Sequence, residues 1–188
     1  MKQFTLCIVY YNMLKHNFAK YITILFFLCS NLFNQTTFEF SADKSYGSTV
    51  NNESITTFEN NVIVKNNDII LFADIAKSFS EQVKLSGNVK MINMLDTLFC
   101  DAITIYKNKN GNDKYVASGS VVFKHENKKI TCDKSNYWPN DLNILSTLSG
   151  EVIMKDDNSI LKCNQLILFH DDINKYKAIG DVDFFQLN

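Results

Sequence analysis

The chain repeats one strand-turn-strand pattern several times, and this repeat constrains the fold more than any other feature. Each copy opens with a Gly-x-Val element and closes with a small residue followed by Asp or Asn. The middle residue of the opening element lies 13 positions before that Asp or Asn in four copies: 61 to 74, 88 to 101, 120 to 133 and 151 to 164. The distance onward to the next copy varies from 14 to 19 residues. We therefore expect a hairpin of fixed length, joined to its neighbours by loops of variable length.

Two positions of the repeat are expected to have structural roles. The glycine marks a bulge or a positive φ at strand entry, and Asn60 replaces it in the first copy because Asn tolerates that conformation. The Asp or Asn is expected to accept hydrogen bonds from backbone N–H groups at a bend in its own strand, since stacked unpaired carboxylates would repel one another. These positions are Gly87, Gly119, Gly150 and Gly180, and Asp43, Asp74, Asp101, Asp133 and Asn164.

Apolar residues alternate with polar ones on both sides of each turn. This period of two predicts strands with one buried face, and strand-turn-strand units near 30 residues apart predict an antiparallel, all-β domain of stacked rungs. The inward-facing positions, which could be packed together or could line a groove for lipid, are Val62, Val64, Leu71, Val89, Met91, Leu98, Val121, Phe123, Ile130, Val152, Met154, Leu161, Val182 and Phe184.

Three cysteines occupy one repeat position. Cys100, Cys132 and Cys163 stand where Ala42 and Ala73 stand in other copies. We therefore expect small, inward-facing core residues, which is the usual environment of a free Cys. A disulfide between neighbouring rungs is a less favoured alternative, and a Cys-based metal site is disfavoured because no second ligand type recurs beside them.

Composition argues against several classes of function. The net charge of the 188-residue chain is -1, which does not favour nucleic acid as a partner. All 19 basic residues are Lys, so the chain lacks the side chain best suited to bidentate phosphate binding. The three histidines, His16, His125 and His170, are isolated from any nucleophile or metal-ligand spacing. We expect no enzyme, no cofactor and no metal.

The N-terminal region contains an apolar run over residues 21–33, preceded by lysines. This is the pattern of a secretory signal, and the run is shorter than the roughly 20 residues that a spanning helix needs. An uncleaved inner-membrane anchor and a translation start at Met13 are the alternatives. The hypothesis is a signal peptide or membrane anchor over residues 1–36, followed by an exported β-domain over 37–188.

The repeat resembles a known family. The units FENNVIVKNNDIILFAD, SGNVKMINMLDTLFCD, SGSVVFKHENKKITCD and SGEVIMKDDNSILKCN are similar to the OstA-like repeat of the LptA family of lipopolysaccharide transport proteins. This repeat is shared by LptA, LptC and the N-terminal domain of LptD. The resemblance covers about residues 38–188, and FSADKSY at 40–46 resembles the family's opening strand.

The chain departs from the family pattern at three points. Asn60 replaces a Gly, Asn164 replaces an Asp, and the aromatic residue that closes the motif is matched only by Tyr137. Ser78, Ile105 and Leu168 occupy that place in other copies. These departures bear on individual bends and leave the expected architecture unchanged.

The resemblance implies an open, twisted antiparallel β-jellyroll whose interior holds acyl chains. It implies a non-enzymatic periplasmic carrier that binds lipopolysaccharide or a related glycolipid and passes it from inner to outer membrane. Its protomers would join head to tail through edge strands, with one another or with LptC-like and LptD-like domains. Headgroups would lie near Lys65, Lys90, Lys124 or Lys155. The alternatives are an LptC-like anchored component and a structural or adhesive β-repeat module with a packed interior.

Overall fold

The computed structural model describes residues 38–108, 112–141, 143–170 and 175–187. The predicted signal peptide or anchor over residues 1–36, and the alternative start at Met13, lie outside the described residues. In the part of the chain that the structure describes, no helix has the length and apolar character needed to cross a membrane.

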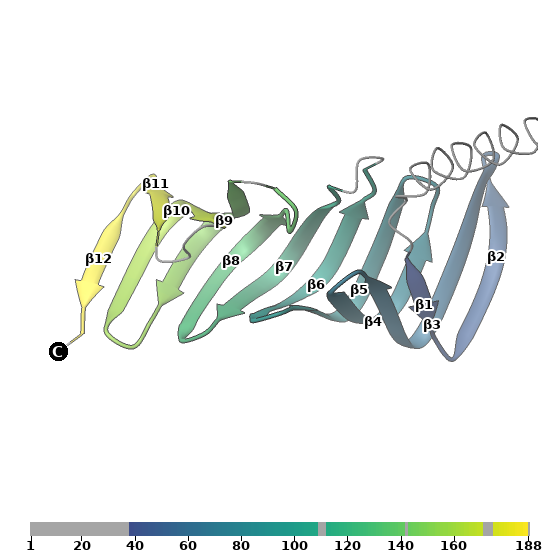
Figure 1. Ribbon diagram of the computed structural model, residues 1–188, viewed down its shortest axis with the longest axis horizontal. Coiled ribbons are helices and arrows are strands. Elements are labelled where there is room, and N and C mark those ends of the chain that lie inside the picture. The colour runs from purple at the N-terminus through teal and green to yellow at the C-terminus, as the bar shows by residue number, and fades with distance from the viewer. Residues whose placement is uncertain (1–37, 109–111, 142, 171–174, 188) are drawn as a thin grey trace, which may run out of the picture. The chain divides into compact units, whose positions relative to one another are not determined.

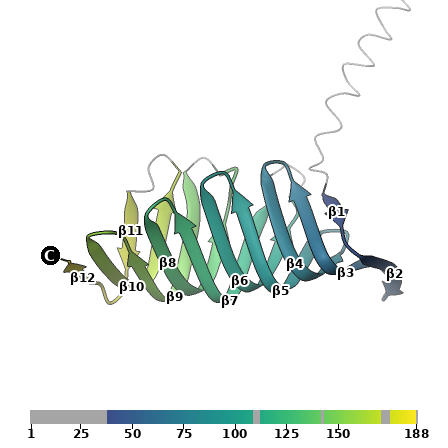
Figure 2. The ribbon, with the colours of Figure 1, turned by 90° about the horizontal axis from the view of Figure 1, so that it is seen from below.

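Twelve strands form one antiparallel sheet that follows the chain (Figure 1). The sheet order is β1-β3-β4-β5-β6-β7-β8-β9-β10-β11, while β2 pairs with β3 and β12 pairs with β10. Successive hairpins therefore stack on one another, and the sheet stays open, as the sequence predicts (Figure 2). The strands are β1 (Glu39–Ser41), β2 (Lys44–Val50), β3 (Glu53–Asn66), β4 (Ile69–Ser78), β5 (Gln82–Asn93), β6 (Asp96–Tyr106), β7 (Lys114–His125), β8 (Lys128–Tyr137), β9 (Ile144–Lys155), β10 (Ser159–Phe169), β11 (Tyr176–Ile179) and β12 (Asp183–Gln186).

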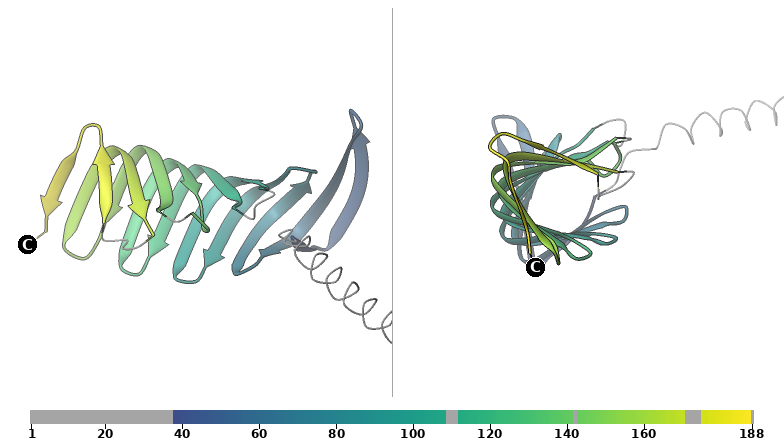
Figure 3. Two further views of the ribbon diagram at one scale, coloured as in Figure 1. Left: turned by 45° about the horizontal axis from the view of Figure 1, so that its top comes forward. Right: turned by 90° about the vertical axis from the view of Figure 1, so that its left-hand side faces the viewer.

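The sheet folds along its length into two facing arms, because each pairing from β3–β4 to β9–β10 contains a register shift near its middle (Figure 3). Such bulges bend a strand and re-aim its side chains. Arm A contains residues 56–59, 75–78, 82–86, 102–106, 114–118, 134–137, 144–149 and 165–169; arm B contains 62–66, 69–73, 89–93, 96–100, 121–125, 128–132, 152–155 and 159–163.

The conserved spacing of the repeat is explained by the packing at each bend. Gly87 has a φ of 77°, and a Cβ atom added there would overlap the carboxylate of Asp74 on the preceding strand. Only glycine accommodates both the positive φ and this close approach without strain. The predicted bulge and positive φ are thereby confirmed, but Gly87, Gly119 and Gly150 lie in the middle of their strands and not at strand entry. The same contact joins Gly119 to Asp101, Gly150 to Asp133 and Gly180 to Asn164.

The hydrogen-bond donors to two of the repeated aspartates differ from those expected. Asn61 Nδ2 donates to Asp43 Oδ2 at 2.8 Å, and Asn88 Nδ2 donates to Asp74 Oδ2 at 2.9 Å. The expectation of backbone donors within the same strand is therefore wrong for these two residues. Each carboxylate instead lies against the bulge of the next strand, where the residue after the Gly position presents a side-chain amide.

Candidate functional site

The inner face of arm B forms one continuous apolar row. It starts at Phe40 in β1 and ends at Phe184 in β12, and every member pairs directly with the next. Between these ends lie eight predicted lining residues, each at most 4 % exposed: Val64, Leu71, Met91, Leu98, Phe123, Ile130, Met154 and Leu161. A second row lies nearer the bend and contains Val62, Val89, Val121 and Val152, each 1 % exposed.

Two predicted lining residues are not buried. Val182 is 48 % exposed and precedes β12, while Phe184 is 58 % exposed. Phe184 still pairs with Leu161 and so shares its face of the sheet. Its exposure follows from its place in the last strand, where no further rung covers it. Phe184 therefore lies on the expected inward face although it is exposed, whereas Val182 lies outside the strands.

Arm A supplies the other half of the interior, which the repeat alone did not reveal. The period of two runs unbroken through the Gly position in β5, β7 and β9. In β4, β6, β8 and β10 it shifts by one residue after the Asp or Asn position, so a single unbroken alternation misses the inward residues of arm A in these four strands. The fully buried residues of this arm include Ala76, Val83, Leu85, Ile103, Ile105, Tyr115, Ala117, Tyr137, Leu148, Leu166 and Leu168.

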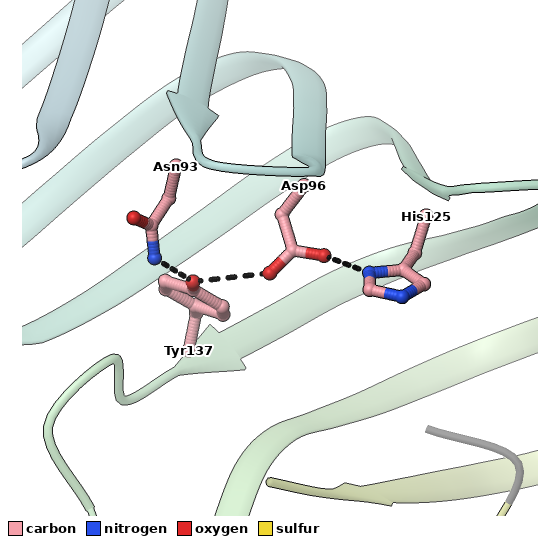
Figure 4. Close-up of polar contacts among 4 residues, drawn as sticks. All are labelled: Asn93, Asp96, His125 and Tyr137. Carbon is pink, nitrogen blue, oxygen red and sulfur yellow. Dashed lines mark hydrogen bonds and ion pairs between the residues drawn. The ribbon is translucent and has the colours of Figure 1, made fainter. Parts of the chain in front are cut away.

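Polar side chains join the two arms at their outer edges, which we call the mouth (Figure 4). Tyr137, at the end of β8 on arm A, accepts a hydrogen bond from Asn93 Nδ2 at 2.5 Å and donates one to Asp96 Oδ2 at 3.3 Å. Asn93 and Asp96 flank the turn between β5 and β6 on arm B. The His125 Nδ1 atom lies 2.6 Å from Asp96 Oδ1, on the adjacent strand.

A second link of the same kind lies closer to the N-terminal end of the sheet. Asn66 Nδ2, at the end of β3, donates to Tyr115 Oη at 2.7 Å and to Asp113 Oδ2 at 2.9 Å. The Tyr115 and Tyr137 rings are 6.2 Å apart in a T-shaped contact. Asn66 Oδ1 is buried without a hydrogen-bond partner. We call Asn66, Tyr115, Asn93, Asp96 and Tyr137 the mouth clasp.

Burial governs the titration of the mouth clasp. Desolvation raises the pKa of the Asp96 carboxyl above its ordinary value, and the contacts with His125 and Tyr137 offset this only in part. Burial also raises the pKa of Tyr137 and of Tyr115, so both phenols stay protonated and able to donate. The mouth therefore holds two buried carboxylates, Asp96 and Asp113, each with a side-chain donor from the clasp, which suits a structural link.

The three cysteines lie where the repeat predicts. Cys100, Cys132 and Cys163 are buried and are not in disulfides. Burial raises the pKa of the Cys100 thiol to about 12 and that of Cys132 to about 11. Within the described ranges, no group of three or more His, Cys, Asp or Glu side chains could hold a metal ion.

The lysines expected at the headgroup face away from the interior. Lys90 lies between buried Val89 and Met91, and Lys124 follows buried Phe123, so the period of two places both on the outer face of arm B. Lys65 and Lys155 follow buried Val64 and Met154 in the same way. A headgroup belonging to a chain held between the arms would therefore be separated from these lysines by the sheet.

The fold and the site together define an open antiparallel β-repeat domain, with an apolar interior between two arms and a polar clasp at the mouth. Neither a protein-family model nor a curated protein sequence significantly matches the chain.

Proposed function

We propose that the protein is a non-enzymatic periplasmic carrier of the OstA-like kind. It binds the acyl chains of lipopolysaccharide or a related glycolipid between its arms and passes the lipid from inner to outer membrane. The observation that supports this proposal is the apolar row from Phe40 to Phe184, which no polar residue interrupts. A row of this length offers an extended chain continuous apolar contact along the sheet.

Binding requires the arms to separate, because their own side chains fill the interior. Among the described strands, no backbone ladder joins the arms at the mouth, where side-chain hydrogen bonds link them. Each such bond contributes about 1 kcal/mol net. Removing about 200 Å² of acyl surface from water contributes roughly 5 kcal/mol at ~25 cal/mol per Å². Acyl burial of this size exceeds the contribution of the clasp bonds alone, and the acyl chain must also replace the apolar contacts that the two arms make with each other.

The ends of the sheet support transfer to a neighbour. Strand β2 pairs only with β3, and β12 pairs only with β10, so each leaves one edge unpaired among the described strands. Exposed Phe184 continues the inner row up to this edge. Pairing of β12 with a first strand of another copy, or of an LptC-like or LptD-like domain, would extend both the sheet and the apolar row.

Retention of lipid tests the carrier proposal. The protein is purified from a bacterium that makes lipopolysaccharide, or is incubated with labelled lipopolysaccharide, and its lipid content is measured by extraction and mass spectrometry. We expect measurable retention of at most one acylated glycolipid per protomer. Excess unlabelled lipid should displace the labelled lipid. Protein that remains folded and never retains glycolipid by either route would contradict the proposal.

A second candidate function is a structural β-repeat module whose interior is simply packed. The observation that favours it is the near-complete burial of twelve predicted lining residues by the protein's own side chains. Such a module would keep its fold and stability unchanged in the presence of lipid. A membrane-anchored, LptC-like role is a variant of the carrier, and the mass of the mature protein's N-terminus distinguishes the two.

A further inference from the structure

The outer face of arm B carries lysines in an arrangement that the carrier proposal does not use. Lys124, Lys129 and Lys155 are direct cross-strand neighbours on β7, β8 and β9. All three side chains are exposed. Like charges placed directly opposite each other on a sheet are unfavourable. This stack therefore raises the electrostatic free energy of the isolated domain.

No acidic residue pairs across the strands with these lysines; the exposed Asp74, Asp101 and Asp133 border the face at the bend, and Asp156 and Asp157 follow Lys155 at the turn. The outward positions of arm B on the six strands from β4 to β9 form two rows of paired residues, and these rows contain four lysines and no Asp or Glu. We call these rows the lysine face: Ile70, Phe72, Lys90, Ile92, Thr97, Phe99, Val122, Lys124, Lys129, Thr131, Ile153 and Lys155.

Aromatic rings lie beneath the lysine heads. Lys90 Nζ is 5.9 Å from the centroid of the Phe72 ring and 5.8 Å from that of Phe99, while Lys124 Nζ is 5.4 Å from the Phe99 centroid. Both rings are half-buried, with the lysine stems lying across them. The lysine face therefore presents ammonium groups above an apolar layer.

We propose that the lysine face docks the domain on an anionic phospholipid surface. Ammonium groups are point charges that pair with headgroup phosphates without a fixed geometry, and the chain has no Arg to supply the bidentate alternative. Half-buried Phe and Ile side chains suit the boundary between headgroups and acyl chains. The stacked charges of Lys124, Lys129 and Lys155 are neutralised there. Because the face lies outside arm B, docking leaves the interior free.

Arm A provides a matched control. Its outer face also carries exposed lysines, Lys77, Lys84 and Lys134, and the first two are direct cross-strand neighbours. Its outward rows on β4 to β9 contain one aromatic residue, Tyr106, which pairs with Gln82 and Lys114 and not with these three lysines. Lys84 Nζ lies 5.4 Å from the centroid of the Phe79 ring, so one lysine of the control set also has an aromatic neighbour. Removing three lysines from either arm changes the net charge by the same amount. A difference in membrane affinity between the two variants would therefore indicate a localised docking surface.

The experiment is co-sedimentation of the full chain with phosphatidylcholine vesicles that contain or lack phosphatidylglycerol. We expect binding only to the anionic vesicles. A K124Q/K129Q/K155Q variant should lose on the order of a hundredfold in affinity, since each lysine near an anionic surface contributes about a factor of five. A K77Q/K84Q/K134Q variant should lose much less. The segment before residue 38 is the same in all proteins, so it cannot produce this difference.

Several outcomes would overturn the docking proposal. These are equal losses in the two triple variants, equal binding to both kinds of vesicle, and no vesicle binding by the unmodified protein. Binding to a soluble polyanion such as heparin without vesicle binding would also overturn it. Circular dichroism and thermal midpoints verify that both variants are folded. The K124Q/K129Q/K155Q variant is expected to be no less stable than the parent, because it loses a like-charge stack.

Discussion

Tyr137 of β8 accepts a 2.5 Å hydrogen bond from Asn93 of β5, although these two strands are not neighbours in the sheet. The bond passes between the arms at the mouth. Asn66 of β3 and Tyr115 of β7 make the same kind of contact at 2.7 Å. In both cases the partner lies several strands further along, because the twist of the sheet offsets one arm against the other.

Removal of the Tyr137 hydroxyl is expected to weaken the mouth clasp. Tyr137→Phe keeps the ring but leaves Asn93 Nδ2 without its acceptor and Asp96 Oδ2 without a donor. Urea denaturation should show a loss of about 1–3 kcal/mol in the free energy of unfolding. Tyr106→Phe, at an exposed position (48 %), should change it by less than about 0.5 kcal/mol. Equal stabilities of the two variants would show that the clasp contributes nothing.

The buried Asp96 carboxyl predicts a particular pH dependence. Its pKa is raised in the folded protein by desolvation, so folding favours the protonated form. The stability that Asp96 contributes is therefore present below its unfolded pKa and is lost as the pH rises through its folded pKa. The stability of the parent relative to Asp96→Asn should fall over that range, as measured by urea denaturation at a series of pH values.

Asp141 provides a control with the opposite sign. Hydrogen bonds from the backbone N–H groups of Ile144 and Asn143 lower the pKa of this exposed carboxyl. Its contribution is present above the unfolded pKa and is lost as the pH falls through the folded pKa. Asp141→Asn should therefore reduce stability more at neutral than at acid pH. Slopes of the same sign for Asp96 and Asp141 would contradict this assignment.

The close approach at each bend makes its glycine sensitive to substitution. Gly119→Ala places a Cβ atom into the Asp101 carboxylate, at a φ of 75°. The strain of the positive φ alone should cost of order 1–3 kcal/mol. Gly47→Ala should be nearly neutral, because nothing lies within 4 Å of the added Cβ atom. Thermal unfolding of both variants measures the difference, and a stable Gly119→Ala protein would exclude the proposed packing.

Cys100 and Cys132 are expected to be unreactive in the folded protein. Burial raises the thiol pKa of Cys100 to about 12 and that of Cys132 to about 11, which leaves little thiolate near pH 8. Alkylation, located by peptide mass spectrometry, should be slow at Cys100 and Cys132 in the native protein and rapid in denaturant. Rapid native labelling of these two residues would contradict their assignment as core residues.

The sequence predicted the rungs because their signals are local. Alternation in Val121 and Phe123 marks an inward face, and Gly119 with Asp101 marks the bend. The mouth clasp was missed because it depends on the twist of the sheet. Asn66 and Asn93 end strands beside turns, where Asn is common for other reasons, and nothing near them in sequence indicates a tyrosine partner.

The exposure of Val182 and Phe184 could not be predicted from the sequence. Val182 and Phe184 continue the alternation, but burial depends on a further strand that would cover them, and none does so in the described residues. The outward placement of the lysines expected near the headgroup, by contrast, could have been predicted. Period-two reasoning, applied fully to Lys90 and Lys124, already places them on the outer face, where the structure has them.

Site-specific photocrosslinking in cells is the most direct test of an acyl-binding interior. A photoreactive phenylalanine analogue replaces buried Phe123, exposed Phe184 on the same inner row, or Val116 on the outer face of arm A. Thermal unfolding verifies each variant, and Phe184 serves even if Phe123 does not tolerate the analogue. The prediction is a glycolipid adduct at positions 123 and 184 and none at 116. No glycolipid adduct at either inner position, or an equal yield at 116, would contradict a lipid-carrying interior.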